Sequence, residues 1–424
     1  MNRTVMLIDG ARTPFLRAGT EFADLMSYQL AAHAIKGAVD RAGVMPDQVD
    51  QVVMGTVVHN VRTPNVAREA ALTAGLRQQT PCHTVSQACI SANQAYSQAA
   101  DLIRLGQADL VVAGGVDCAS DTPILFRKSM RKKLMASQKL KSTWDYLKFI
   151  FKLRPADFLP EKPQVAEWLT NRSMGADCEM LAAKFAITRA AQDEFALRSH
   201  TLAQQAQQAG HLAKEIVPVE LPPMFQPISH DNGIRVSPLD TLSKLKPAFV
   251  KPHGTITAAN ASFLTDGAAA VVLTAEDSLK RLGLEPKAEL LDYVFTGQDL
   301  REELLLGPTY AIAKLLKRNN LKLDQIDVIE MHEAFAGQIL ANLAAMSSRE
   351  FADENLDGFP LGPIDLGKLN LWGGSLSIGH PFGATGARLL NTAANRLKSE
   401  GGKLALVAAC AAGAHGHATL IRSL

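Results

Sequence analysis

Two patterns of hydrophobic residues alternate along most of the chain. Short continuous runs of Val, Leu, Ile and Ala, such as "ADLVVAGG" at 108–115 and "KLALVAAC" at 403–410, are typical of strands buried on both faces. Longer segments with the spacing of helices separate these runs. The alternation predicts an α/β protein whose parallel strands are covered by helices on both sides.

Two distant parts of the chain repeat the same succession of elements. "PDQVDQVVMGTVV" from Pro46 and "LDQIDVIEMHEAF" from Leu323 each resemble a helix end, an Asp-Gln turn and a buried strand. Farther along, Cys89 and His380 each precede a segment with helical spacing and another buried strand. The repeat predicts two similar halves, with Cys89 and His380 at corresponding turns.

The pattern changes between the two halves. Helical and irregular segments, including the proline-rich "VPVELPP" at 217–223, predict an inserted loop domain over 119–244. Strand-like sequence returns after Lys251 and is expected to rejoin the first half. We therefore expect a first half made of 1–118 and 245–275 and a second half over 276–424.

Composition narrows the class of protein. Of the 424 residues, 47% are hydrophobic and 20% charged, which is typical of a globular chain, and no apolar run approaches the ~18 residues of a membrane span. The opening "MNRTVMLIDG" resembles neither a signal nor a transit peptide, so we expect a cytoplasmic protein, with a mature mitochondrial chain as the alternative. The five cysteines show no CxxC spacing, which indicates neither a disulfide framework nor a zinc site.

One segment departs from the nearly neutral net charge of +2. Residues 127–154 hold ten Lys and Arg but a single acid, Asp145. Helical spacing over 142–154 places aromatic and aliphatic side chains on one face: Trp144, Leu147, Ile150 and Phe151. This combination is typical of an interfacial helix, and equally of a solvated charged face around a small satellite core. A single local patch does not indicate a nucleic-acid binder.

Cys89 lies in "VSQACISANQA", where an apolar strand gives way to a helix. Unpaired N–H groups at a helix N-terminus favour a thiolate, so the thiol pKa is expected to fall below its ordinary ~8.5. The alternative is a small buried hydrophobic residue, the commoner role of cysteine.

His380 and Cys410 are the next candidates. His380 stands in "SIGHPFGATGARLL", whose glycines allow a ligand to approach the backbone and whose imidazole can act as a base; a structural turn cap is the alternative. The same stretch matches neither a Walker loop nor GxGxxG. Cys410, in "AACAAGAHG", follows a buried strand, where ligands of α/β sheets bind and where buried cysteines are also common.

His332 and Glu333 follow another buried strand in "MHEAFAGQ". An HExxH zinc motif is excluded because Ala336 stands where the second histidine would be. Since the two halves are expected to face each other, Cys89, His332, His380 and Cys410 can meet in one cleft between strand ends.

From "ARTPF" at 11–15 to the C-terminus, these blocks resemble the thiolase family. The resemblance implies the thiolase fold: duplicated βαβαβαββ halves in five layers (αβαβα), an inserted helical loop domain and a homodimer. It implies that Cys89 is the acylated nucleophile, that His380 activates it and that Cys410 transfers protons. His332 takes the place of an Asn that supports an oxyanion site in many thiolases. Backbone N–H groups of Cys89 and Ala412 would form the second oxyanion site, although Ala412 replaces a family glycine.

The chain is most similar to beta subunits of fatty-acid oxidation trifunctional enzymes. The similarity rests on the motifs "HEAF", "GHPFGATG" and "CAAG" and on the basic insertion. This implies thiolysis of medium- or long-chain 3-ketoacyl-CoA, with coenzyme A as co-substrate and no bound cofactor or metal. It also implies an alpha partner with hydratase and 3-hydroxyacyl-CoA dehydrogenase activities, and contact of 127–154 with that partner or with anionic membrane. The implied coenzyme A contacts are Met174, Arg235, Phe249, Ser262 and Phe335. The alternatives are a short-chain acetoacetyl-CoA thiolase and a non-catalytic acyl-CoA binder or scaffold.

Overall fold

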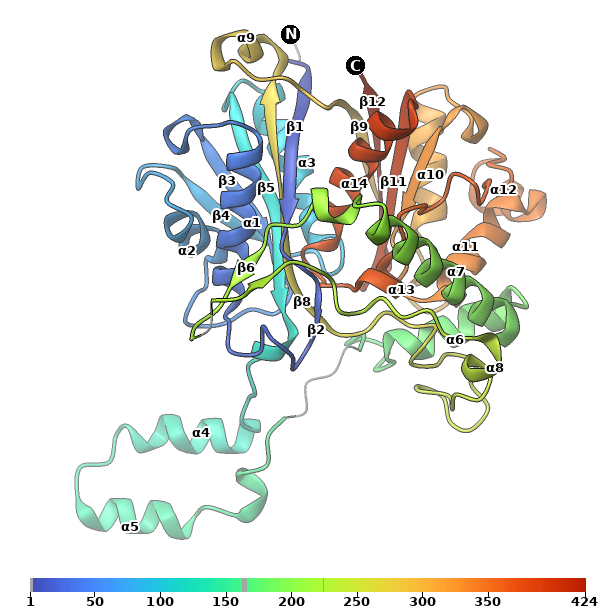
Figure 1. Ribbon diagram of the computed structural model, residues 1–424. Helices are drawn as coiled ribbons and strands as arrows, with labels where there is room; N and C mark the ends of the chain where they lie inside the picture. Colours follow the sequence, from blue (N-terminus) through green and yellow to red (C-terminus); the bar gives the residue numbers. More distant parts are fainter. Residues whose placement is uncertain (1–2, 162–165, 224) are drawn as a thin grey trace.

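The computed structural model describes residues 3–161, 166–223 and 225–424. Two groups of strands stand side by side (Figure 1). The strands of the large sheet are β1 (Val5–Arg12), β2 (Leu16–Arg17), β3 (Gln51–Gly55), β4 (Cys82–Val85), β5 (Leu110–Cys118), β8 (Thr265–Ala275), β9 (Ala288–Gly297), β10 (Val328–Met331), β11 (Leu404–Ala411) and β12 (His415–Ser423). Their order is β10-β11-β12-β9-β1-β8-β5-β3-β4, with β2 on β8. Among the described residues, the strands of the two groups pair with each other only where Met6 and Leu7 of β1 meet β9.

Helices cover both groups and separate them. The helices of the two halves are α1 (Ser27–Arg41), α2 (Val66–Thr73), α3 (Ser91–Arg104), α9 (Leu279–Leu282), α10 (Gly307–Arg318), α11 (Ala336–Ser347), α12 (Arg349–Asn355), α13 (Ser375–Ile378) and α14 (Thr385–Glu400). In Figure 1, α1 and α2 lie outside the first group, α10 and α11 outside the second, and α3 and α14 between them. The predicted five-layer α/β architecture is confirmed.

The strands are buried on both faces, as their continuous hydrophobic runs predict. In β1, Val5 and Leu7 belong to the core between the two groups of strands, whereas Met6 and Ile8 belong to the core beneath α1 and α2. Burying apolar surface on both faces stabilises the fold by about 25 cal/mol per Å². The catalytic candidates therefore stand at strand ends held rigidly from two sides.

The two halves follow the predicted repeat with one difference. The first half runs β1-α1-β3-α2-β4-α3-β5-β8. In the second half, the third strand is reduced to a single bridge between Leu369 and Ile329. The Asn370 side chain explains the difference: its amide accepts from the Met331 N–H (2.8 Å) and donates to the Met331 carbonyl (2.9 Å). One side chain thus takes both hydrogen bonds that a neighbouring strand would make.

The described part of the insertion consists of two unlike portions. α4 (Lys128–Ser137) and α5 (Thr143–Phe151) form a helical hairpin that projects from the body (Figure 1). The second portion contains α6 (Met174–Lys184), α7 (Arg189–Gln208), α8 (Leu239–Leu242), β6 (Val219–Glu220) and β7 (Pro227–Ile228). Here α6 and α7 pack on α11, so this portion shares a hydrophobic core with the second half.

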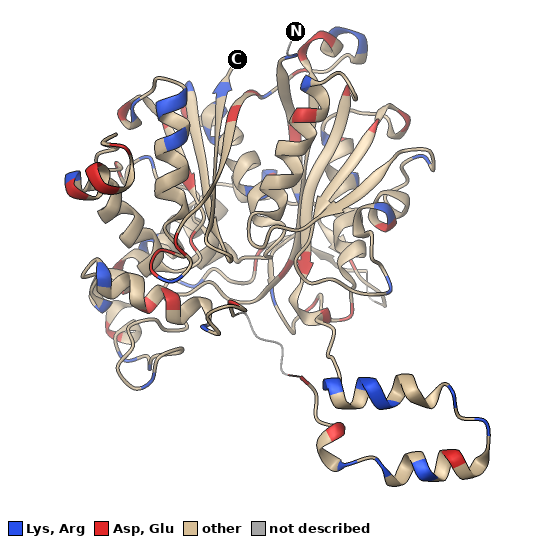
Figure 2. Ribbon diagram, turned by 180° about the vertical axis from the view of Figure 1, so that it is seen from behind, with Lys and Arg blue, Asp and Glu red and all other residues tan. Residues whose placement is uncertain are grey.

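The projecting hairpin is basic and exposes large apolar side chains. Bands of Lys and Arg follow both helices (Figure 2). The predicted apolar face is present on α5, where Phe151 is 87% exposed and Trp144 64%. Within the described ranges, no helix combines the length and the apolar character needed to cross a membrane.

Candidate active site

Cys89 lies in a tight turn between β4 and α3. Ala88 takes the left-handed backbone conformation with φ +46°, which non-glycine residues rarely adopt. Ser91 holds this turn, because its hydroxyl accepts from the Gln87 N–H (2.8 Å) and donates to the Ala88 carbonyl (2.7 Å). The helix itself begins at Ser91, so Cys89, the expected helix start, precedes the observed start by two residues. The turn places the sulfur close to residues of the second half, His332 and His380.

The predicted fall in the Cys89 pKa is wrong. Burial raises the pKa of the thiol to about 11, and the nearby Asp117 carboxylate adds to the rise. Backbone N–H groups of Ala412 and of Cys89 itself point at the sulfur and oppose the increase, but they do not overcome it. Desolvation destabilises the thiolate more than hydrogen bonds from these N–H groups stabilise it. Cys89 therefore rests as a thiol and needs a base.

His380 supplies a nitrogen acceptor for that proton. It precedes α14, with its backbone N–H bonded to Thr265 (2.9 Å) and its Nδ1 2.7 Å from the Thr385 hydroxyl. Thr385 also donates to the Pro381 carbonyl (3.1 Å), so its oxygen accepts from Nδ1–H and leaves the Nε2 lone pair free. Burial lowers the pKa of His380 to about 3, which keeps the resting ring neutral.

His332 stands beside His380, at the end of β10. The centroids of the two rings are 4.0 Å apart, and the planes are inclined by 42°. Neither Nε2 atom has a hydrogen-bond partner within the described part of the chain, although both are buried. Burial, together with the neighbouring His380, holds the pKa of His332 well below its ordinary value.

The structure brings three of the predicted residues together. Ligand-type atoms of Cys89, His332 and His380 all lie within 4.8 Å of one another. The two histidines come from the second half and the cysteine from the first, so the repeat does place these turns against each other. Such atoms can serve acid–base chemistry or bind zinc; the sequence-based expectation of no metal stays a prediction.

Cys410 completes the group from the end of β11. Its side chain is 1% exposed, and burial raises the pKa of its thiol well above the ordinary value. The charge of a Cys89 thiolate would raise that pKa further, which reflects the proximity of the two sulfurs. Ala409 and Ala411, on either side of Cys410, pack with Ile90 and contact Cys89. The strand thus fixes the second thiol beside the first.

Asp117, at the end of β5, holds the loop that carries His380. Its carboxylate accepts from the backbone N–H groups of Gly383 (2.6 Å) and Val58 (2.7 Å) and from the Thr56 hydroxyl (3.0 Å). Burial still raises the pKa of Asp117 to about 6. A residue of the first half therefore anchors the His380 loop of the second half.

Four of the five predicted coenzyme A contacts are close to one another. The Phe249 and Phe335 rings meet edge to face with centroids 5.8 Å apart, and Gly175, next to Met174, lies against Phe249. Ser262 donates its N–H to the Ala334 carbonyl (2.9 Å). Arg235 instead lines a cavity of about 490 Å³ with Phe263, whose ring also lies near Gly379. That cavity borders the His380 loop.

Several residues of the site were not predicted. Arg17 lines the same cavity with its guanidinium carbon 3.9 Å from the centre of the Phe263 ring. Thr385, Ser375 and Arg388 lie behind the two histidines. Ser375 and Arg388 are polar residues among apolar neighbours in "GGSLSIGH" and "GARLL", a signal that marks them as buried and bonded but does not identify their partners.

Comparisons with known proteins define the class. The description "Thiolase, N-terminal domain" matches residues 5–277, and "Thiolase, C-terminal domain" matches residues 284–423. The chain therefore belongs to the thiolase family, and the predicted thiolase fold is confirmed.

Two relatives and one solved structure are similar to this chain over nearly its whole length. The chain is 51% identical to "Trifunctional enzyme subunit beta, mitochondrial" of Bos taurus over 422 residues, 99% of this chain and 88% of the relative. It is 48% identical to "Probable 3-ketoacyl-CoA thiolase" of Caenorhabditis elegans over 99% of this chain and 94% of the relative. The crystal structure of human mitochondrial 3-ketoacyl-CoA thiolase in complex with CoA superposes with a TM-score of 0.85 at 29% identity, covering 100% of this chain and 98% of that one.

Proposed function

We propose that this chain is a 3-ketoacyl-CoA thiolase of fatty-acid β-oxidation, which cleaves 3-ketoacyl-CoA with coenzyme A to acetyl-CoA and an acyl-CoA two carbons shorter. The convergence of Cys89, His332 and His380 within 4.8 Å carries the proposal. The names of the Bos taurus and Caenorhabditis elegans relatives support the same activity.

In the first half-reaction, His380 Nε2 takes the Cys89 proton and the thiolate attacks the 3-keto carbon of the substrate. Charge then develops on the former carbonyl oxygen, next to His332 and His380. Collapse of the adduct breaks the Cα–Cβ bond, leaving an acyl-thioester on Cys89 and the enolate of acetyl-CoA. Cys410 donates its proton to the enolate carbon, and acetyl-CoA departs.

In the second half-reaction, the Cys410 thiolate takes the proton of the incoming coenzyme A thiol. The resulting thiolate attacks the acyl-thioester and releases the shortened acyl-CoA, and the Cys89 thiolate recovers its proton from His380. Backbone N–H groups of Cys89 and Ala412 point at the Cys89 sulfur, which supports their role as one oxyanion site. We expect each oxyanion site to contribute about 3 to 4 kcal/mol of transition-state stabilisation.

The coenzyme A moiety is assigned to Met174, Arg235, Phe249, Ser262 and Phe335. Arg235 and Arg17 both line the cavity beside the His380 loop, and their cationic side chains suit the phosphates of coenzyme A. The aromatic pair Phe249 and Phe335 offers an apolar wall for the pantetheine arm. Coenzyme A acts here as a co-substrate rather than as a bound cofactor.

The same proposal includes partners. We infer a homodimer associated with an alpha subunit that carries hydratase and 3-hydroxyacyl-CoA dehydrogenase activities, as the relatives named trifunctional enzyme subunit beta suggest. The projecting hairpin of α4 and α5 supports a docking role, because it stands clear of the body (Figure 2) and exposes large apolar side chains such as Phe151. Its contact is assigned to anionic membrane or to the alpha subunit. The cytoplasmic location stays a prediction, beside relatives whose names say mitochondrial.

One assay tests the activity and the alternatives together. Thiolysis rates are measured for 3-ketoacyl-CoA substrates from short to long acyl chains, with and without a candidate alpha subunit. Faster turnover of medium and long chains supports the proposal. Preference for acetoacetyl-CoA would instead indicate the short-chain thiolase, and binding of acyl-CoA without turnover would indicate a non-catalytic scaffold.

A further inference from the structure

The two nitrogens of the His332 ring have different surroundings. Nδ1 lies 2.9 Å from the Ser375 hydroxyl, while Nε2 is buried without a hydrogen-bond partner among the described residues. Because Nδ1 faces Ser375, Nε2 is the ring nitrogen left to face Cys89 and His380, and one ligand-type atom of each of the three residues lies within 4.8 Å of the others. Which nitrogen carries the proton decides whether His332 donates or accepts a hydrogen bond in the reaction.

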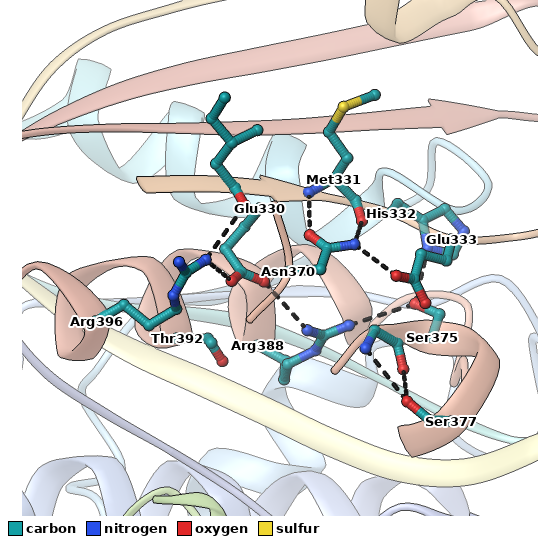
Figure 3. Close-up of polar contacts among 12 residues, drawn as sticks. Glu330, Met331, His332, Glu333, Asn370, Ser375, Ser377, Arg388, Thr392 and Arg396 are labelled. Carbon is teal, nitrogen blue, oxygen red and sulfur yellow. Dashed lines mark hydrogen bonds and ion pairs between the residues drawn. The ribbon is translucent and has the colours of Figure 1, made fainter. Parts of the chain in front are cut away.

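The Ser375 hydroxyl settles that choice through its second contact. An Arg388 Nη2–H donates to the same oxygen at 3.3 Å (Figure 3). A guanidinium can only donate, so the Ser375 oxygen accepts there and its own proton remains available. Over the described ranges, His332 Nδ1 is the only other partner of this hydroxyl. The opposite arrangement, with Nδ1–H donating to Ser375, leaves a buried hydroxyl proton unbonded, which costs about 1 to 3 kcal/mol.

Arg388 is itself held in place from behind. Its Nη1 lies 3.7 Å from the Glu330 carboxylate, which also accepts from Arg396 at 2.8 Å, and all three side chains are fully buried. Figure 3 shows these groups in a row leading from Arg396 to Ser375. A guanidinium has no acceptor atom, so Arg388 cannot exchange its donor role with the serine. The hydrogen-bond direction at Ser375 is therefore built into the fold.

We infer that Ser375, oriented by Arg388, fixes His332 as the tautomer with its proton on Nε2, so that His332 donates a hydrogen bond toward the reacting oxygen while His380 accepts the Cys89 proton. Two adjacent histidines thus hold opposite tautomers, one set by Ser375 and the other by Thr385. Ser375 and Arg388 are positioning residues. This inference rests on the proposed function for the role of the donor, but not for the tautomer itself.

The assignment also bears on metal binding. With a proton on His332 Nε2, the group of Cys89, His332 and His380 offers only one nitrogen lone pair beside the sulfur. A zinc ion needs neutral nitrogen donors with free lone pairs. The tautomer that suits oxyanion stabilisation is therefore the one that disfavours a metal.

The tautomer is tested by solid-state NMR of wild-type protein carrying ¹⁵N-labelled histidine. Protonated and unprotonated ring nitrogens differ widely in ¹⁵N shift, and the His332→Asn spectrum identifies the His332 signals. We expect a protonated Nε2 and a bare Nδ1 at His332, and the reverse at His380. A protonated Nδ1 at His332 overturns the inference. This readout needs no substrate, so it stands or falls independently of the thiolase activity.

Ser375→Ala then tests the positioning role, with Ser377→Ala as its matched control. Ser377 is an equally buried hydroxyl two residues away, bonded to Gly374 and Ser199 rather than to His332. In Ser375→Ala we expect mixed His332 tautomers and a fall of kcat by about 10- to 100-fold with KM within about twofold, because an oxyanion donor acts mainly in the transition state. Ser377→Ala should keep the wild-type tautomer and kcat.

Ser375→Thr keeps the hydroxyl and serves as the rescue variant; its kcat and His332 spectrum should remain near wild type. An unchanged His332 spectrum in folded Ser375→Ala would overturn the positioning role. If Ser375→Ala does not fold, Ser375→Cys replaces it, since a thiol fills the space but donates only weakly. A wild-type protein with the expected tautomers but no thiolysis would refute the proposed function alone.

Discussion

His332 and His380 lie ring against ring, 4.0 Å apart between centroids, with neither carrying a charge at rest. Burial disfavours the cation in each ring, and a proton on one would repel a proton on the other. The pair can therefore accept only one proton at a time. That suits a site in which a single thiol must be deprotonated.

The Cys89→Ala variant should lose thiolysis and acyl-enzyme formation, while its thermal midpoint stays within about 3 °C of wild type, because the deletion removes one small group at a turn. Intact-protein mass spectrometry after incubation with acyl-CoA reads the acyl adduct directly. Cys118→Ala is the control: this buried thiol bonds to the Leu25 carbonyl, away from the site, and its removal should leave the adduct intact. An acylated Cys89→Ala protein would show that another residue is the nucleophile.

Acid should destabilise the protein through its buried neutral histidines. Burial lowers the pKa of His417 from 6.5 to about 3, as it does for His380. At pH values between these two pKa values, the histidine is protonated in the unfolded chain and neutral in the folded chain. The free energy of unfolding therefore falls as pH decreases. Each such histidine contributes a slope of up to about 1.4 kcal/mol per pH unit.

His417→Gln should therefore lessen the loss of stability between about pH 6 and pH 4 by roughly that slope, whatever its effect at neutral pH. Urea unfolding at several pH values measures this difference. The exposed His253→Gln is the control for replacing a histidine by glutamine at a position outside the core. Parallel wild-type and His417→Gln curves would contradict the neutral state of buried His417.

The buried pair of Glu330 and Arg396 should be costly to break on one side. Burial raises the pKa of Glu330 to about 7 even beside its two arginines. Arg396→Met leaves the carboxylate poorly compensated and should lower stability by about 3 to 5 kcal/mol. Adding Glu330→Gln removes the charge and should recover part of that loss, as thermal unfolding of the single and double variants will show. Additive losses would mean that the two side chains do not interact.

The hairpin should bind independently of catalysis. Replacing exposed Ile150 and Phe151 by Ser should weaken sedimentation with anionic vesicles, or pull-down with the alpha subunit, at least several-fold, because burial of apolar side chains contributes to binding at both surfaces. Thiolysis should remain unchanged. Leu105→Ser, another exposed apolar position, is the control and should bind as wild type. Equal binding by all three proteins would place the docking surface elsewhere.

Much of the fold was readable from local patterns. The helical segment expected after Cys89 is α3, Ser91–Arg104, and the two Asp-Gln turns are 3₁₀ turns at Pro46–Gln48 and Leu323–Gln325. Continuous apolar runs and turn residues act over short distances, so one sequence reveals them. The absence of a full third strand in the second half was not predicted, because it depends on the hydrogen bonds that the Asn370 side chain makes.

The sequence predicted which residues form the site but not the pKa of its nucleophile candidate. Cys89 and His380 were found from the repeat, since equivalent turns of two halves meet. The pKa of Cys89 was misjudged because the number of donors at a helix start is visible in the sequence, whereas the depth of burial is not. Ser375 and Arg388 escaped notice because a hydrogen-bond partner 43 residues away cannot be read from spacing.

The hairpin of α4 and α5 stands apart from the layers that hold Cys89, and few of its side chains take part in their cores. Substitutions there leave the packing of the catalytic turns almost untouched. Natural selection can therefore reshape the surface of this hairpin separately from the rate of the reaction.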